Sequence, residues 1–546
     1  MTAPYRELLQ QIREFFPKPV ADPMHGAYFV FSILRALDKV DAMKGAIPLL
    51  GGAVGLDYEA QRSARIAERP SSIDAVTSEL VKTLEGMLIS GHPGVQMNVV
   101  PPPSIASIIG ALLPSIYNPN LVSDDTSQKV AVAEHRVAAM AAALVGYDPA
   151  LSRGVFTFGG TGTTLYGVRI GTEKALPGTR KKGIEQGGAL VFASDLSHFC
   201  RLSVASWLGL GEDNVVEIPT GIDNDIKLDL LEKAMRTALK DGRRIATIIA
   251  TMGTTDAFGL DDVGAIVALR DRLVEEFRLD YRPHVHADAV IGWAWSVFND
   301  YDFEENPLGF RPRTVRALNG ACRRIHELSQ ADSVGIDFHK TGFAPYISSL
   351  FLLKDGSDLG LIARTRDRMP YLFQTGSYHP GIFTLETTRA GTGVMAALAN
   401  LLLLGKDGLR SLLGHMVEIA EVLRENLDAH AATTVMNSGN VGTVTLFRAY
   451  PDGIDTWTVK DRERTDPGYR EKLIAHNEYN RKLHSFLHEE AMAGRGVLIS
   501  MTDCYRTTDY GEPIVALKSF ILSPFADEAI VELLVERLLE ARERIR

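Results

Sequence analysis

The sequence predicts an α/β fold: a large domain with a mostly parallel sheet, preceded by a helical N-terminal segment and followed by a smaller α+β C-terminal domain. Two observations predict it. From Gly154 onward, short continuous apolar runs alternate with helical stretches, which is typical of strands buried on both faces of a parallel sheet. After about residue 400, a long helical pattern is followed by β-like runs and a closing helix, which is an α+β order.

The elements follow from these patterns in chain order. Helical spacing dominates up to about Gly146. The predicted strands of the large domain are 154–158, 189–194, 214–218, 244–252, 284–288, 333–337 and 348–354. The smaller domain is expected to hold a helix at 408–427, strands at 441–448 and 514–522 and a helix from about Asp527, with an exposed loop over 450–470. We therefore expect three parts, residues 1–117, 118–400 and 401–546.

Composition restricts the class of partner. The 546 residues carry a formal net charge of -10 and a pI near 5.8, and no window supplies the clustered basic residues of a nucleic-acid surface. The three cysteines form no C-x-x-C pair, so neither disulfides nor a thiolate metal site is expected. The first 16 residues have amphipathic rather than signal-peptide spacing, and no apolar run reaches the roughly 20 residues of a membrane span. We expect a soluble cytoplasmic protein with a small-molecule partner and no bound metal.

In open α/β sheets, ligands bind at the carboxyl ends of the strands, so the residues that follow each strand are candidates for the site. The first strand leads into Gly160, Thr161 and Gly162, whose backbone N–H groups at a helix start suit a phosphate, although a plain tight turn fits equally. His198 follows the second strand, where a histidine is more often structural. Thr254 follows the run at 244–252 and fits a simple turn as well as a site.

Two further strand ends carry charged groups in apolar surroundings. Asp288 ends a predicted buried strand, where a carboxylate is unfavourable unless a cation pairs with it, so a functional role is favoured. Lys340 follows the strand at 333–337 and precedes an apolar, aromatic stretch. A buried lysine loses its proton easily and can form an imine with a carbonyl, whereas a lysine that reaches the surface is only a solvated charge.

The combination favours one cofactor. A phosphate cradle, a ring-facing histidine, a buried carboxylate and an imine-forming lysine are the contacts that pyridoxal 5'-phosphate (PLP) requires. The carboxylate keeps the pyridine nitrogen protonated, so that the ring withdraws electrons from the substrate's α-carbon. A nicotinamide or a flavin would need no such lysine. The sequence therefore predicts a PLP enzyme.

These same residues resemble the group II PLP-dependent amino-acid decarboxylases, the family of glutamate, tyrosine and aromatic amino-acid decarboxylases, over roughly residues 91–404. ADSVGIDFHKTGFAPY resembles D-S-x-x-x-D-x-H-K, HADAVIG resembles H-V-D-A-A-x-G, and SDLSHF, FGGTGTT and GTTDAFGLDD resemble further family motifs. The resemblance implies the type I PLP-enzyme (aspartate aminotransferase-like) fold. It also implies a homodimer with its active site at the subunit interface.

The resemblance assigns roles residue by residue. Lys340 is expected to form the Schiff base, with His339 as its neighbour, and Asp288 is expected to pair with the pyridine nitrogen. His198 is expected to stack on the ring, with Ala289 or Val290 in the pocket wall. The phosphate is expected at Gly160, Thr161 and Gly162, and Thr254 is expected near the cofactor. TLETTRAG resembles E-x-S-R-x-G, which places Glu386 and Arg389 near the active site. Tyr371 is the candidate for the tyrosine that protonates the product carbanion, and simple packing is its alternative role.

The expected reaction is decarboxylation of an L-amino acid to its amine through a quinonoid intermediate. GFAPYISS after the lysine also resembles the segment of sphingosine-phosphate lyase, so an aldolytic carbon–carbon lyase is the alternative. The chain departs from the family pattern at AVIGW after Asp288, at Thr163 and Thr164 in the phosphate loop, and at Ser203, where a lysine is usual. Because these changes lie where the pocket wall is expected, they leave the substrate open.

Overall fold

A seven-stranded sheet forms the centre of the large domain. The computed structural model describes residues 12–13, 15, 23–184, 187–370 and 375–545. The strands lie in the order β2-β8-β7-β6-β5-β3-β4. They are β2 (Arg153–Thr157), β3 (Ala189–Ser194), β4 (Val215–Ile218), β5 (Arg244–Thr251), β6 (His284–Asp288), β7 (Ser333–Asp337) and β8 (Ser349–Leu353). β8 runs antiparallel to both of its neighbours and the other pairs are parallel, so the predicted mostly parallel α/β fold is confirmed.

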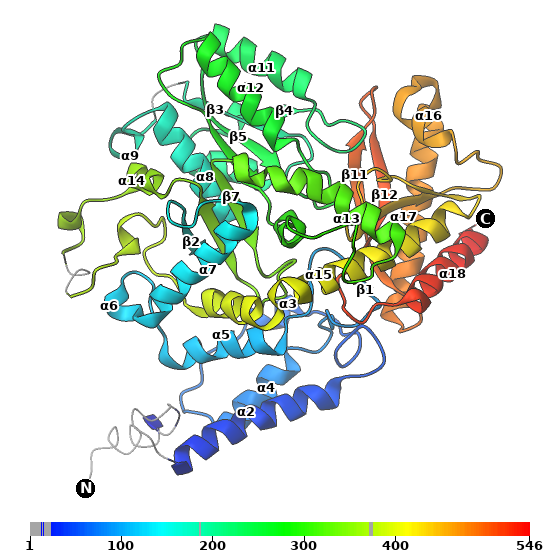
Figure 1. Cartoon of the computed structure of the whole chain (residues 1–546). Coiled ribbons are helices and arrows are strands. Elements are labelled where there is room, and N and C mark those ends of the chain that lie inside the picture. The colour runs from blue at the N-terminus through cyan, green and yellow to red at the C-terminus, as the bar shows by residue number, and fades with distance from the viewer. Residues whose placement is uncertain (1–11, 14, 16–22, 185–186, 371–374, 546) are drawn as a thin grey trace.

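Helices cover both faces of this sheet (Figure 1). The helices of this part of the chain are α5 (Ile105–Tyr117), α6 (Asp124–Ser127), α7 (Lys129–Val145), α8 (Gly160–Ala175), α9 (Thr179–Lys182), α10 (Cys200–Trp207), α11 (Leu228–Lys240), α12 (Val263–Glu276), α13 (Pro312–Ile325) and α14 (Leu359–Ile362). Of these, α5, α6 and α9 pack on other helices. Along β5, Ile245 and Ile248 belong to the core beneath α11 and α12, whereas Ala246 and Ile249 belong to the core beneath α8 and α10. This alternation explains the uninterrupted apolar run of β5.

The smaller sheet has the order β1-β11-β12-β10-β9. Its strands are β1 (Val95–Gln96), β9 (Thr433–Val435), β10 (Val444–Ala449), β11 (Leu498–Thr507) and β12 (Pro513–Phe520), and its helices are α16 (Val459–Thr465), α17 (Arg470–Met492) and α18 (Glu528–Ile545). β9 and β11 were not predicted. The prediction of an exposed loop over 450–470 is wrong, because this stretch holds α16, and its Glu463 is fully buried with Arg448 and Tyr450 as partners.

One long helix links the two domains. α15 (Thr392–Asp428) contains the predicted helix 408–427 and is kinked at Gly405, whose φ is 57°. It packs along α5 (Figure 1). The predicted domain bounds stay a prediction, although α15 runs across the expected boundary at 400.

The N-terminal segment holds α2 (Pro23–Met43), α3 (Tyr58–Gln61) and α4 (Ile73–Lys82). α2 and α4 lie side by side, away from the large sheet (Figure 1). Short 3₁₀ turns occupy Glu212–Asn214, Gly292–Phe298, His326–Gln330, Gly356–Asp358, Arg366–Arg368, Pro380–Ile382 and Pro467–Tyr469. Within the described ranges, no helix has both the length and the apolar character that crossing a bilayer requires.

Candidate active site

Lys340 lies in the turn that follows β7, with its amine directed at a buried carboxylate. Its Nζ is 3.2 Å from Oδ2 of Asp337, and the two side chains are 18% and 1% exposed. Asp337 Oδ1 accepts a hydrogen bond of 2.6 Å from the Ser349 hydroxyl on β8. The amine is therefore largely withdrawn from solvent and paired. Sequence reasoning gave Asp337 no role, although the D-x-H-K motif contains it.

His339 points toward β8. Its Nδ1 is 3.1 Å from the carbonyl oxygen and 3.2 Å from the amide nitrogen of Ser348, and its Nε2 is 3.5 Å from Asp337 Oδ2. Burial lowers the pKa of the ring, which the carboxylate of Asp337 opposes. The ring centroid is 4.2 Å from that of Tyr346. His339 thus fixes the turn that carries Lys340.

Asp288 is the last residue of β6 and is only 6% exposed. Its Oδ1 has no hydrogen-bond partner among the described residues. Burial raises the pKa of this carboxyl to about 6, while the positive charge of Lys340 opposes the rise. Because a buried, unsatisfied carboxylate is unfavourable, Asp288 is suited to a cationic hydrogen-bond donor that enters the site.

His198 follows β3 and lies within electrostatic reach of Lys340 and Asp337. Its Nδ1 accepts a hydrogen bond of 3.2 Å from the backbone N–H of Cys200. Burial lowers the pKa of the ring, and the nearby charge of Lys340 lowers it further. A flat ring within electrostatic reach of Lys340 is able to stack on a planar ligand.

The glycines at the start of α8 allow a close approach to Asp337. A Cβ on Gly160 would lie 2.9 Å from Asp337 Oδ2 and 3.0 Å from Val290 Cγ1, and a Cβ on Gly162 would overlap the Thr157 hydroxyl. The first N–H groups of a helix have no intrahelical acceptor and bind anions. The structure therefore brings a potential phosphate site next to Lys340.

Three more of the predicted site residues belong to the buried interior of the protein. Thr254 is buried, and its Oγ1 accepts the Gly259 N–H at 2.8 Å, which closes a turn. Ala289 and Val290 are also buried, and Val290 lies against Gly160. Thr254 thus has the turn-closing contact that the sequence had left as its alternative.

Cys200 was not singled out from the sequence, although it is the second residue after His198. The side chains of Thr161 and Thr164 are its hydrogen-bond partners, and burial raises the pKa of its thiol to about 12. The charges of Asp288 and Lys340 also act on this pKa. The thiol therefore lies between the start of α8 and the site.

Glu386 and Arg389 differ in their surroundings. Arg389 is 3% exposed and makes a two-pronged ion pair with the fully buried Glu134 on α7. Glu386 is half-buried, and its Oε2 accepts a hydrogen bond of 2.9 Å from the Tyr166 hydroxyl. Tyr371 lies outside the described residues.

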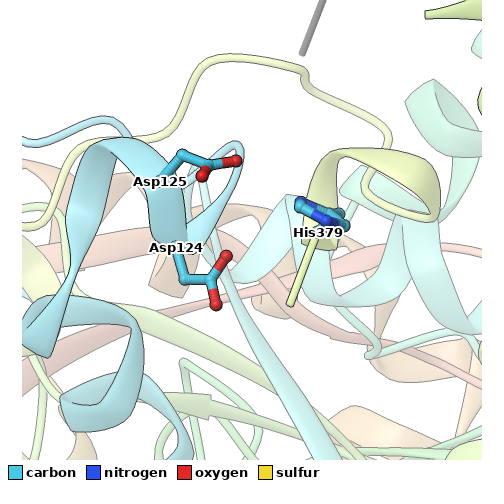
Figure 2. A group of neighbouring side chains, drawn as sticks. All are labelled: Asp124, Asp125 and His379. Atoms are coloured by element: carbon cyan, nitrogen blue, oxygen red, sulfur yellow. The ribbon is translucent and has the colours of Figure 1, made fainter. Parts of the chain in front are cut away.

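Asp124, Asp125 and His379 form a separate cluster in which one ligand atom from each lies within 4.8 Å of the others (Figure 2). Figure 2 shows the two carboxylates on α6 and the ring of His379 on the neighbouring segment. Asp124 Oδ2 accepts the backbone N–H groups of Ser377 and Tyr378, each at 3.0 Å. The acidic pair therefore fastens the segment before His379 to α6, and the cluster carries no metal proposal.

A family model described as "Pyridoxal-dependent decarboxylase conserved domain" matches residues 57–449. The chain belongs to this family. An L-2,4-diaminobutyrate decarboxylase of Rhizobium meliloti (strain 1021) is 27% identical over 79% of this chain and 81% of its own length. An L-tyrosine decarboxylase of Enterococcus faecium is 27% identical over 58% of this chain and 52% of its own length.

Solved structures of decarboxylases have the same fold. The glutamate decarboxylase domain of a diaminobutyrate-pyruvate transaminase and L-2,4-diaminobutyrate decarboxylase from Vibrio parahaemolyticus matches 99% of this chain and 100% of its own, with a TM-score of 0.73 and 18% identity. Oryza sativa TDC with PLP and tryptamine matches 97% and 99%, with a TM-score of 0.76 and 17% identity. The type I PLP-enzyme fold is confirmed.

The protein is a PLP-dependent amino-acid decarboxylase, and the aldolytic lyase alternative is not favoured. Its residues fit the cofactor. Asp288 presents an unsatisfied buried carboxylate oxygen for a protonated ring nitrogen, and the start of α8 offers N–H groups for a phosphate. Lys340 lies in the turn after β7, the strand that pairs with β6, at whose end Asp288 lies.

Proposed function

We propose that Lys340 forms the covalent link to PLP, that Asp288 pairs with the ring nitrogen, that His198 stacks on the ring, and that the start of α8, at Gly160–Gly162, holds the phosphate. The observation that carries this proposal is the unsatisfied, buried Oδ1 of Asp288 in electrostatic reach of Lys340. When bound, PLP withdraws electrons from the α-carbon of the substrate, so that CO₂ can leave.

Asp337 holds and orients the amine of Lys340. Its Oδ2 is 3.2 Å from Nζ, and Ser349 fixes the other carboxylate oxygen. Because Asp337 is 1% exposed, little water competes for this contact. We propose that Asp337 positions Nζ and accepts its proton when the lysine must be neutral to react. Tyr371 stays our candidate for the group that returns a proton to the product.

We also propose that the enzyme works as a homodimer. α5 exposes a row of apolar side chains beside the exposed Leu402 and Leu403 of α15. The row on α5 comprises Ile105, Ile108, Ile109, Leu112, Leu113 and Tyr117. Contiguous apolar surface of this kind marks interaction sites, and a second copy is the partner that the family resemblance implies. Light scattering of Ile109→Asp against the wild-type protein tests this, because a dimer through α5 should dissociate. The cytoplasmic location stays a prediction.

The reaction is tested by supplying single L-amino acids to the PLP-loaded protein and measuring CO₂ and the amine. We expect at least one amino acid to release CO₂, and Lys340→Ala to abolish the release. Lys354→Ala is the matched control, because Lys354 is an exposed lysine just after β8 and its loss should leave activity unchanged. Release of an aldehyde from a phosphorylated amino alcohol, with no CO₂ from any amino acid, would contradict the proposal.

A further inference from the structure

We propose that a cavity beside the active site receives the side chain of the substrate and that Glu386 binds a distal ammonium group there, so that the preferred substrates are amino acids with a short basic side chain. This inference rests on the proposed function and specifies its substrate class. The relatives do not decide the class, because their names include both a diamino acid and tyrosine as substrates.

The cavity has a volume of about 330 Å³ and adjoins the proposed cofactor site. Its lining includes Phe156, Phe158, Tyr346, Ile347, Glu386 and Thr388. Two contacts join it to the site. The ring of Tyr346 lies against that of His339, and Thr157, which also lines the cavity, lies directly beside Gly162 at the start of α8. A substrate held at Lys340 is therefore next to this space.

Glu386 dominates the charge of the cavity. Arg389 also lines it, but both of its terminal nitrogens are bound to Glu134 and to backbone carbonyl oxygens, so its charge is neutralised. Among the described residues, no Lys, Arg or His nitrogen lies within the 4.0 Å of an ion pair from the Glu386 carboxylate. The cavity therefore presents a carboxylate that lacks a cation.

The carboxylate is also held in place. The Tyr166 hydroxyl donates to Oε2, and the same hydroxyl accepts the Leu385 N–H at 2.8 Å. Tyr166 is fully buried, so Glu386 is oriented by a rigid neighbour while Oε1 remains for a ligand. Preorganised carboxylates of this kind bind ammonium groups well because little reorganisation is needed on binding.

The rest of the wall suits the stem of such a side chain. Apolar surface for its methylene groups is offered by Phe156, Phe158, Tyr346 and Ile347. A distal carboxylate, as in glutamate, would meet Glu386 as a like charge, and an aromatic ring would cover it without a partner. The repulsion between like charges and the burial of an unpaired carboxylate both weaken the binding of these substrates.

The test measures binding rather than turnover. The visible absorbance of the PLP-loaded protein is titrated with 1,3-diaminopropane and with propylamine, which differ only in the distal ammonium group. We expect the wild-type protein to bind the diamine about 10- to 100-fold more tightly, which is the effect of one charged hydrogen bond. In Glu386→Gln, which keeps an acceptor for Tyr166, this preference should vanish while propylamine binds as before.

A second arm uses the wild-type protein alone, so that a misfolded variant leaves the inference testable. 2,4-Diaminobutyrate and ornithine should have a lower KM than glutamate and tyrosine. Equal binding of both amines by the wild-type protein, or an unchanged preference in Glu386→Gln, would overturn the inference. A protein that decarboxylates only acidic or aromatic amino acids overturns the inference but leaves the proposed function intact, whereas absence of all decarboxylation contradicts the proposed function itself.

Discussion

Replacing Asp288 by asparagine should stabilise the protein without its cofactor and weaken cofactor binding. In the cofactor-free protein this carboxyl is buried, its pKa is raised to about 6 from an ordinary value of 3.8, and one oxygen lacks a partner. Ionising it in the folded state is therefore unfavourable. Asparagine has nearly the same shape and carries no charge, so the substitution removes that penalty together with the group that pairs with the ring nitrogen.

The interval between the two pKa values corresponds to about 3 kcal/mol. The pKa of Asp288 is higher in the folded state than in the unfolded state, so ionised Asp288 destabilises the fold of the wild-type protein. This destabilisation is absent below about pH 4, grows as the pH rises toward 6, and reaches its full size above pH 6. The cofactor-free Asp288→Asn protein should thus exceed the wild type in free energy of unfolding by about 3 kcal/mol at pH 7.5 and by about half of that at pH 5.

Urea denaturation followed by tryptophan fluorescence at the two pH values measures this difference. The affinity for PLP, from the visible absorbance, should fall by about 10- to 100-fold in the same variant, since a charged hydrogen bond is lost. Asp213→Asn, an exposed aspartate in the same domain, is the control and should change neither quantity. Wild-type stability of the Asp288→Asn protein at pH 7.5 would show that the ionised carboxyl of Asp288 does not destabilise the fold, and wild-type affinity for PLP would show that Asp288 does not pair with the ring nitrogen.

Three further predictions concern the surroundings of the site. Arg389→Met leaves Glu134 buried without its cation and should lower the free energy of unfolding by about 3–5 kcal/mol. The melting temperature should fall accordingly, and adding Glu134→Gln should partly restore it, whereas an unchanged melting temperature would show that the ion pair does not stabilise the fold. Gly162→Ala places a methyl group on Thr157 and should destabilise the protein by about 1–3 kcal/mol and weaken PLP binding, whereas normal binding would show that α8 can shift freely. Asp124→Ala removes the acceptor of two backbone N–H groups and should speed proteolysis within residues 375–379, and an unchanged cleavage pattern would contradict this.

The strands of the large domain could be predicted nearly to the residue. β3, β6 and β7 have the predicted bounds, because their continuous apolar runs end at polar residues or turns. Those strand ends include Asp288 and lead directly into Lys340, so the order of candidate groups could also be predicted. The antiparallel direction of β8 could not be predicted, because an apolar run does not indicate which strand it will pair with or whether the pairing will be parallel.

Contacts between segments distant in the sequence were the part that the sequence could not supply. The pairing of Arg389 with Glu134 joins residues 255 positions apart, and nothing in either local pattern indicates the other. The burial of Glu463 likewise depends on Arg448 of β10, whose charge pairs with the carboxylate, and on the Tyr450 hydroxyl, which donates a hydrogen bond to it. Sequence alone therefore predicts that such a polar stretch is exposed to solvent, because its buried partners are not visible in the local pattern.

Reduction with borohydride shows whether Lys340 carries the cofactor. Borohydride converts an imine between PLP and a lysine into a stable amine, so peptide mapping by mass spectrometry locates the modified residue. We predict a pyridoxyl-phosphate group on Lys340 and its absence from Lys340→Arg treated in the same way. A modified peptide that contains a different lysine, or no modified peptide from a protein with bound PLP, would show that Lys340 does not form the imine.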